Sequence, residues 1–237
     1  MRNAIIIPID KDEKLIIASD NSGAIGEKEM DAVKVGYDIV SYYSFRVAVM
    51  ECMAAGGTPI SVLLHNFCGD DEWGKLVKGV KKGLSDLGME HVSISGSTES
   101  NFPLEQSAVG IVVIGKGKPP AQDIIHGGFE AAVIGSPLIG HEVIEQNQKV
   151  ASLSIFNKIL DLDDVYVWPV GSKGILHELK QINSQWSAQT SKHIDSDVDL
   201  NKPAGPSTCF IALYPSELSY SIKELTGSLY HPLNLMT

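Results

Sequence analysis

The chain has 237 residues, of which 43% are hydrophobic and 20% are charged, and these values are typical of a soluble globular protein. Its formal net charge of -10 argues against a nucleic-acid partner, which would need clustered Lys and Arg in excess. The three cysteines are isolated and lack CxxC spacing, so neither a zinc site nor a disulfide framework is expected. A reducing cytoplasm is therefore the expected compartment.

The N-terminal sequence MRNAIIIPIDKDEK contains a short apolar run that ends at Pro8 and acidic residues. This run is too short for a signal peptide or a membrane span, so no membrane association is expected.

Short strand-like runs alternate with longer helical patterns, which predicts a mixed α/β protein. Strands are expected at Ala4–Pro8, Lys14–Ala18, Ile60–Leu64, His91–Ser95, Ala108–Ile114, Glu130–Ile134, Tyr166–Val170 and Cys209–Tyr214. The stretch Gly115–Pro120 combines Gly and Pro after a strand, which predicts a linker. We therefore expect an N-terminal lobe of residues 1–118 and a smaller C-terminal lobe of residues 119–237.

Two long helices are predicted in the N-terminal lobe. Residues Ile39–Ala55 end at Gly56, Gly57 and Pro59, and residues Asp71–Leu87 show apolar positions at helical spacing before Gly88. In the C-terminal lobe, helical patterns lie at His141–Gln148, Leu153–Leu160, Lys173–Ile182 and Glu217–Leu225.

The first long helix carries a stripe of small residues with one acid, formed by Ser44, Val47, Ala48, Glu51 and Ala55. Such a stripe allows close approach of another group. Two interpretations remain open here: a bound ligand, or close packing onto a sheet with Glu51 at its edge.

Polar residues follow three of the predicted strands: Asp20-Asn21, His65-Asn66, and Ser97-Thr98-Glu99. The sequence has no Walker A motif, since His141 and Glu142 follow Gly140 where Lys and Ser/Thr belong. An isolated acid at a strand end usually faces water. The recurrence of polar residues after three predicted strands nevertheless favours a ligand site. Carboxylates beside Gly-rich backbone suit Mg²⁺ and a polyphosphate, so ATP and Mg²⁺ are the expected cofactors.

Four segments resemble a known superfamily of ATP-binding proteins. They are KLIIASD at 14–20, FRVAVMECMAAGGTPISVLLHNF at 45–67, SISGSTESNFP at 93–103 and VGSKGILHEL at 170–179. Their order resembles that in aminoimidazole ribonucleotide synthetase, thiamine-monophosphate kinase, selenophosphate synthetase and the hydrogenase maturation dehydratase. The resemblance implies a two-lobed α/β (α+β) fold with a mixed sheet in the N-terminal lobe, and a homodimer formed through the N-terminal lobes.

The resemblance also implies roles for individual residues. The metal ligands would be Asp20, Glu51 and Glu99, and Lys173 would contact phosphate. Either His65 or Asn66 would orient the acceptor hydroxyl, although His65 is equally read as an ordinary residue at a strand end. The ATP-binding residues would be Asp20, Asn21, Ser22, Gly23, Gly56, Gly57, Gly96, Ser97, Thr98, Ser172 and Gly174.

The chain departs from the superfamily pattern at several positions. Ala48, Ser97 and Val170 stand where the pattern has Asn, an acid and Asp, and the N-terminal Gly-Asp-Asp-Ala-Ala loop is reduced to Asn3-Ala4. Loss of these acids removes potential metal ligands, which Glu99 or additional waters would have to replace.

The leading hypothesis is an ATP- and Mg²⁺-dependent kinase that phosphorylates the 5'-hydroxyl of a nucleoside. Within the superfamily, the short chain and the GSTESNF turn resemble the alpha-ribazole kinases, which salvage the lower ligand of cobalamin. The alternatives are an ATP-dependent ligase or cyclase of the synthetase type, and a nucleotide-binding regulator without catalysis.

For the homodimer, Lys14–Ala18 and Ala108–Ile114 are expected to be open sheet edges. Residues Gly23–Asp31 are interpreted either as a lid over ATP or as a mobile loop.

Overall fold

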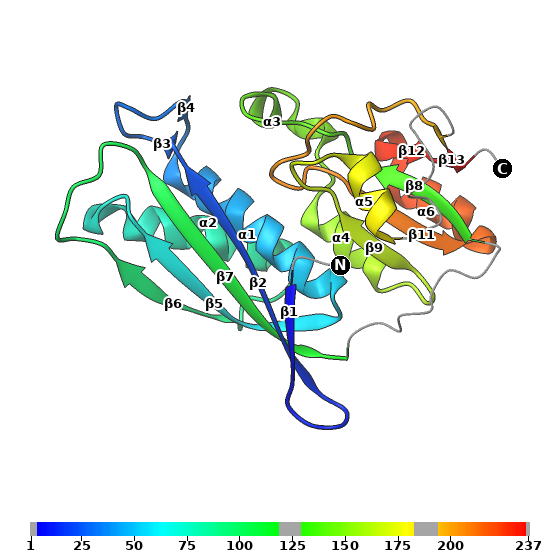
Figure 1. The fold of residues 1–237 in the computed structure, drawn as a ribbon, viewed down its shortest axis with the longest axis horizontal. Helices are drawn as coiled ribbons and strands as arrows, with labels where there is room; N and C mark the ends of the chain where they lie inside the picture. The colour runs from blue at the N-terminus through cyan, green and yellow to red at the C-terminus, as the bar shows by residue number, and fades with distance from the viewer. Residues whose placement is uncertain (1–3, 119–128, 183–193, 236–237) are drawn as a thin grey trace. The chain divides into compact units, whose positions relative to one another are not determined.

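The computed structural model describes residues 4–118, 129–182 and 194–235, shown in Figure 1. Contacts between residues divide the chain into two compact units, 2–120 and 121–237. The predicted linker Gly115–Pro120 needs correction at its start, because Gly115–Gly117 are the last residues of a strand. Residues 119 and 120 lie outside the described part of the chain.

The N-terminal unit contains a five-stranded sheet in the order β1-β2-β7-β5-β6. Its strands are β1 Ala4–Pro8, β2 Lys14–Gly23, β7 Ala108–Gly117, β5 Gly57–Asn66 and β6 Ser93–Thr98. Only the β5–β6 pair is parallel. The prediction that Lys14–Ala18 and Ala108–Ile114 are open edges is wrong, because β2 pairs with β1 and β7, and β7 pairs with β2 and β5.

Two helices cover one face of this sheet, as Figure 1 shows behind the strands. Helix α1 (Tyr37–Ala54) packs on β7, β2 and β5, and α2 (Trp73–Asp86) packs on α1. The two helices approach closely at Gly79, where an added Cβ would lie 2.1 Å from the carbonyl oxygen of Asp38. Within the N-terminal unit, no described helix packs on the opposite face, which we call the open face.

Alternation along the strands decides which side chains face α1 and which face the open side. In β5 this alternation is interrupted at one residue. Pro59 pairs with Gly115 and Ser61 pairs with Ile114, so Ile60 between them is an extra residue that forms a β-bulge. Beyond the bulge, Val62 and Leu64 are buried on the α1 side.

The C-terminal unit contains a four-stranded antiparallel sheet in the order β12-β8-β11-β9. Helix α5 (Ile175–Ile182) packs on one face through an apolar cluster that includes Leu179 and Ile211. On the other face, Phe156 of α4 (Leu153–Leu160) contacts Phe210 of β11 with ring centroids 5.2 Å apart, and α6 (Ser219–Thr226) contacts α4. The strands are β12 Tyr230–Pro232, β8 Phe129–Ile134, β11 Phe210–Pro215 and β9 Tyr166–Pro169.

Short elements complete both units. They are β3 Ile25–Gly26, β4 Val33–Lys34, η1 Asp70–Glu72, α3 Glu142–Glu145, η2 Asn147–Lys149, β10 Ile194–Asp195, η5 Ser216–Leu218, η6 Gly227–Leu229 and β13 Asn234–Leu235. The mixed α/β class expected from the sequence is confirmed. In the described part of the chain, none of the helices has the length and apolar character needed to cross a bilayer.

Candidate functional site

The three polar segments singled out in the sequence meet at one end of the N-terminal sheet. Strands β2 and β5 both run antiparallel to β7, and β6 runs parallel to β5. The C-terminal ends of β2, β5 and β6 therefore lie at the same end of the sheet. Residues of these three strands and of β7 lie in continuous rows across the sheet. One row contains Asp20, Ile111, Leu64 and Gly96, and the next contains Asn21, Gly110, His65 and Ser97.

Except for Glu99, which follows β6, these polar residues lie inside the strands and not after them, which corrects the sequence interpretation. Strand β2 continues to Gly23 because it pairs with β7 without interruption from Lys14 to Gly23. Strands β5 and β6 likewise include Asn66 and Thr98. The polar side chains are therefore held at fixed positions by the sheet.

Successive rows point to opposite faces of the sheet, so the predicted site residues divide into two groups. The row of Asp20 faces α1, because Ile111 and Leu64 in that row are fully buried on the helix side. The row of Asn21, His65 and Ser97 faces the open side. The sheet backbone thus separates Asp20 from His65, and the two side chains do not belong to one cluster.

Asp20 is held between β2 and α1. The Ser44 hydroxyl of α1 and the backbone N–H of Asn21 both donate hydrogen bonds to its carboxylate. Burial raises the pKa of Asp20 to about 6, and these two hydrogen bonds only partly counteract the burial. Ser44, noted in the sequence only as part of a small stripe, is thus a direct partner of Asp20.

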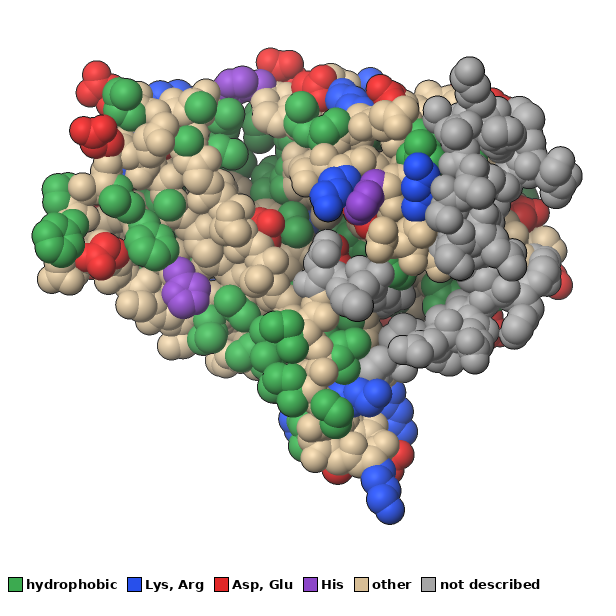
Figure 2. Space-filling view, viewed as in Figure 1, with side chains coloured by type: hydrophobic (Ala, Val, Ile, Leu, Met, Phe, Trp, Pro, Cys, Tyr) green, Lys and Arg blue, Asp and Glu red, His purple; other side chains and the backbone are tan. Residues whose placement is uncertain are grey.

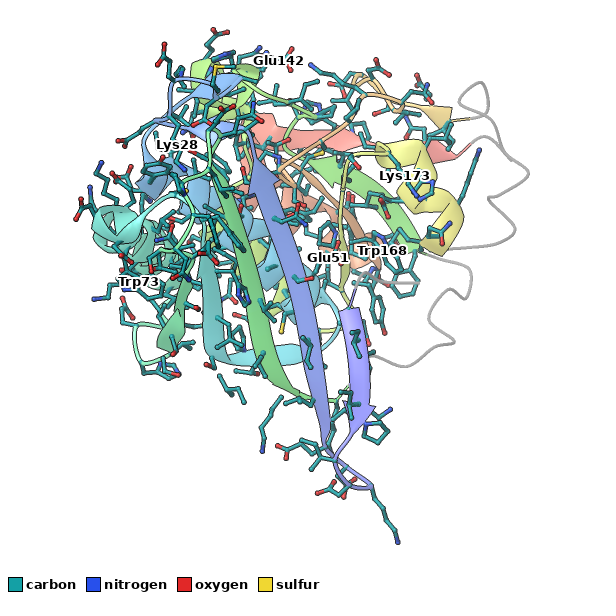
Figure 3. The ribbon with its side chains drawn as sticks, turned by 60° about the vertical axis from the view of Figure 1, so that its left-hand side comes forward. Lys28, Glu51, Trp73, Glu142, Trp168 and Lys173 are labelled. Carbon is teal, nitrogen blue, oxygen red and sulfur yellow. The ribbon has the colours of Figure 1, made fainter. Side chains whose placement is uncertain are left out.

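Asp20 remains partly accessible because the described residues of β1 pair only with Lys14–Ala18. From Ser19 onward, β2 has β7 as its only described neighbour. Glu51 lies seven residues beyond Ser44 on the same side of α1, about 10 Å along the helix axis. It is buried, and Figure 3 shows it beside β2.

The three predicted metal ligands do not assemble into one protein cluster. Within residues 4–118, 129–182 and 194–235, no three His, Cys, Asp or Glu side chains come together in a group that could hold a metal ion. The carboxylate of Glu99 instead accepts hydrogen bonds from the backbone N–H groups of Asn101 and Phe102, at 2.8 and 3.3 Å. Glu99 therefore shapes its own loop.

Asn66 is fully engaged within the protein. Its amide nitrogen donates to the carbonyl of Gly69 at 2.7 Å and lies 3.1 Å from the Thr98 hydroxyl, and its oxygen accepts the N–H of Cys68 at 2.8 Å. The side chain is buried. Asn66 therefore fixes the turn after β5, and both N–H donors of its amide are used within the protein.

Solved structures resemble this chain, although no protein-family model and no curated protein sequence matches it. Thiamine monophosphate kinase from Aquifex aeolicus aligns with a TM-score of 0.63 at 11% identity, over 99% of this chain and 88% of that chain. Hydrogenase maturation protein HypE in complex with ATP aligns with a TM-score of 0.57 at 13% identity, over 92% and 76% of the two chains. PurL from Thermotoga maritima, complexed with AMPPCP, gives a TM-score of 0.57 at 10% identity, over 96% of this chain and 41% of that chain. The chain has the aminoimidazole ribonucleotide synthetase-like fold.

In the C-terminal unit, the structure explains why residues 170 and 174, at the two ends of the turn 170–174, are Val and Gly. Val170, which stands where the superfamily pattern has Asp, is fully buried in the apolar cluster under α5 and is part of the core. Gly174 has a positive φ of 80°, and an added Cβ would lie 2.9 Å from the backbone of Asn201. Between them, Ser172 and Lys173 are exposed, and Figure 3 shows Lys173 at the start of α5.

The predicted nucleotide-binding glycines also have structural roles in this fold. Gly56 ends the turn after α1 with a φ of 87°, and Gly57 allows β5 to begin in contact with Cys52. Both lie at the end of the sheet opposite Asp20, since Gly57 pairs with Gly117. Gly96 permits β6 to approach β5, because an added Cβ would lie 1.9 Å from the carbonyl oxygen of Leu64.

Residues Gly23–Asp31 are anchored to the sheet by a buried hydrogen-bond network that sequence reasoning did not identify. The Asp31 carboxylate accepts bonds from the backbone N–H and the hydroxyl of Ser107, at 2.7 and 2.6 Å, and the Tyr37 hydroxyl lies 2.8 Å from the Ser107 hydroxyl. Burial opposes ionisation of Asp31, but the hydrogen bonds from Ser107 and Lys28 outweigh it and lower its pKa. These contacts fix the end of the segment at Asp31, and both interpretations of the segment, a lid over ATP or a mobile loop, stay predictions.

Proposed function

We propose that the protein is an ATP- and Mg²⁺-dependent kinase that phosphorylates the 5'-hydroxyl of a nucleoside, with alpha-ribazole as the first candidate acceptor. The observation that carries this proposal is the placement of Asp20. Its carboxylate sits between β2 and α1, hydrogen-bonded to Ser44, on a stretch of β2 that has a single described neighbour. It forms no ion pair with any described residue. A bound cation would supply the opposite charge that a partly buried carboxylate needs.

This arrangement fits Mg²⁺ in one specific way. Mg²⁺ in nucleotide sites is commonly held by one or two protein carboxylates, with phosphate oxygens and waters completing six ligands. A site made only of Asp20, Glu51 and Glu99 does not fit, whereas a site that uses Asp20 with a nucleotide does. When bound, the metal would neutralise charge on the transferred phosphate.

The case for ATP rests on the shared fold together with Asp20. Two of the similar solved structures are complexes with ATP and with AMPPCP, and a third is a kinase by name. Phosphoryl transfer mainly requires positioning and charge neutralisation, which a small number of side chains can supply.

In the C-terminal unit, we assign phosphate binding to Lys173. Its side chain is exposed on a turn that Gly174 and the buried Val170 fix in position. Lys173→Ala should raise the KM for ATP by about tenfold, with a smaller change in kcat. An unchanged KM and an unchanged kcat would remove Lys173 from the proposal.

The decisive experiment incubates the purified protein with ATP, Mg²⁺ and a panel of ribosides that includes alpha-ribazole. Phosphorus NMR then identifies the products. A new phosphomonoester formed in equal amount with ADP supports the kinase and identifies its acceptor. Inorganic phosphate without a phosphomonoester favours a ligase or cyclase, and tight ATP binding without turnover favours a regulator.

We further propose a homodimer that uses the open face of the N-terminal sheet. Near the β1–β2 hairpin this face carries Ile5, Ile7, Leu15, Ile17 and Ile114, which share one side of the sheet by their pairing. Figure 2 shows hydrophobic side chains gathered there. An apolar sheet face of this kind is stabilised when a second sheet covers it.

A further inference from the structure

Four large apolar side chains are exposed together at the end of the N-terminal unit where β2, β5 and β6 finish. They come from three loops and are Met30, Phe67, Phe102 and Leu104. We call this set the loop-end surface. Phe102 is 75% exposed, which is unusual for an aromatic side chain outside an interface.

The loop-end surface is held together by hydrogen bonds between its loops. The Lys28 ammonium donates to the carbonyls of Phe67 at 3.2 Å and Leu104 at 2.8 Å, and the Gln106 amide donates to the carbonyl of Met30 at 2.8 Å. Figure 3 shows Lys28 at this end of the sheet. Because the loops are already tied to one another, a partner would find the apolar side chains in place and would lose little entropy in ordering them.

The surface is surrounded by acidic residues. They lie on the same three loops and on η1, which follows Phe67 closely, and they are Glu27, Glu29, Asp70, Asp71, Glu72, Glu99 and Glu105. Figure 2 shows acidic and hydrophobic side chains side by side at this end of the unit. Among the described residues, ion pairs neutralise only Glu27 and Glu72, both of which contact Lys75.

The nearby lysines offset this charge only in part, because Lys28, Lys34 and Lys75 stand against seven carboxylates. Lys28 and Lys34 direct their ammonium groups at backbone carbonyls and not at carboxylates. The rim is therefore negative around an apolar centre. Such a rim repels nucleic acid and anionic lipid headgroups and attracts a cationic partner.

We propose that the loop-end surface docks a cationic, amphipathic segment of another protein. The apolar side chains of that segment would cover Phe102 and Leu104, and its Lys or Arg residues would meet the acidic rim. This arrangement has the usual anatomy of a protein interface, with an apolar centre, a polar rim and an aromatic anchor. The proposal does not depend on the kinase assignment.

The test uses a fluorescent synthetic peptide made only of Leu and Lys in an amphipathic helical pattern, with a Leu/Glu peptide of the same pattern as its counterpart. Binding to the full chain is followed by fluorescence anisotropy at low and high salt. We expect saturable binding of the Leu/Lys peptide that weakens with salt, and no binding of the Leu/Glu peptide.

Three variants locate the binding. The double variant Phe102→Ser/Leu104→Ser should weaken binding at least about tenfold. The charge variant Asp70→Asn/Asp71→Asn/Glu105→Gln should weaken it chiefly at low salt. The matched control is Tyr220→Ser, which removes a side chain that is 76% exposed in the C-terminal unit, and it should bind as the wild type does.

Several results would overturn the proposal. Equal binding by the wild type and the Phe102/Leu104 variant would place the peptide elsewhere, and no binding up to about 100 µM would remove the surface altogether. Binding to vesicles of phosphatidylserine and phosphatidylcholine, lost in the same variant, would assign the surface to a membrane. Melting curves for each variant show whether any loss of binding comes from unfolding.

Discussion

The two faces of the N-terminal sheet are built from the same strands, yet they differ in chemistry. On the face toward α1, Asp20 is partly buried and hydrogen-bonded to Ser44. On the open face, apolar residues such as Ile5 and Ile7 remain exposed. A shift of one residue along a strand therefore moves a side chain from the space enclosed by α1 to an exposed surface suited to association.

The largest expected effect concerns Asp20. Asp20→Asn should reduce ATP-dependent phosphoryl transfer by more than about a hundredfold, because a neutral amide oxygen binds Mg²⁺ much more weakly than a carboxylate does. Turnover is measured by ADP release across a range of Mg²⁺ concentrations. The neighbouring variant Ser19→Ala, on the open face, should keep wild-type turnover. An equal loss in His65→Ala would contradict the assignment of the site to the α1 face.

The next effect compares two glycines in the sheet. Gly96→Ala should destabilise the protein by about 3 kcal/mol or more, because the new Cβ would lie 1.9 Å from the carbonyl oxygen of Leu64. Gly110→Ala, on the open face, meets its nearest neighbour, the Cβ of His65, at 3.5 Å and should change stability by less than about 1 kcal/mol. Urea unfolding measures both variants, and similar losses would show that the close approach of β6 to β5 is relaxed in solution.

A third prediction tests the open face as an interface. Ile5→Lys/Ile7→Lys should raise the dimer dissociation constant by about a hundredfold, because two charges would be placed on the apolar face. Sedimentation at micromolar concentrations measures the mass. The control Ile144→Lys changes an exposed isoleucine of the C-terminal unit and should leave the mass unchanged. A wild-type protein that sediments as a monomer would count against the interface.

The smallest effect concerns the stability cost of an ionised Asp20. Its folded-state pKa of about 6 is raised above the ordinary aspartate value of 3.8, so its contribution to stability is full below about pH 4 and is lost as the pH rises to about 6. In metal-free buffer, Asp20→Asn should therefore be more stable than the wild type by about 1–2 kcal/mol at pH 7.5, after allowing for partial exposure. At about pH 4 the difference should vanish, and thermal unfolding at both pH values measures it. A wild type that is as stable as Asp20→Asn or more stable at pH 7.5 would contradict the raised pKa of Asp20.

Sequence patterns were sufficient for the longer elements. The apolar runs of Ala4–Pro8 and Leu153–Leu160 predicted β1 and α4 with their observed bounds. The short strands β3, β4, β10, β12 and β13 were missed, because two or three residues carry too little periodicity and their pairing depends on tertiary contacts.

The candidate site was predicted less completely than the fold. The sequence indicated correctly that the segments of Asp20, His65 and Ser97 lie at one end of the sheet. It could not show that Asp20 faces α1 while His65 faces the other way, because that depends on strand register. Nor could it show that Asn66 and Glu99 are engaged by their own loops, since such bonds arise only when the turns form.

The bulge at Ile60 has a consequence for comparing related chains. It places one unpaired residue between Pro59 and Ser61. Because Ile60 is not counted in the alternation, the residues of β5 before and after the bulge alternate between the two faces as they would in a regular strand. A homologue lacking this residue would form a regular strand and still direct the counterparts of Leu64 and Asn66 toward α1. An alignment of such chains should therefore place its gap at Ile60, where a deletion leaves every side chain on the same face of the sheet. A deletion beside His65 would move the following side chains to the opposite face.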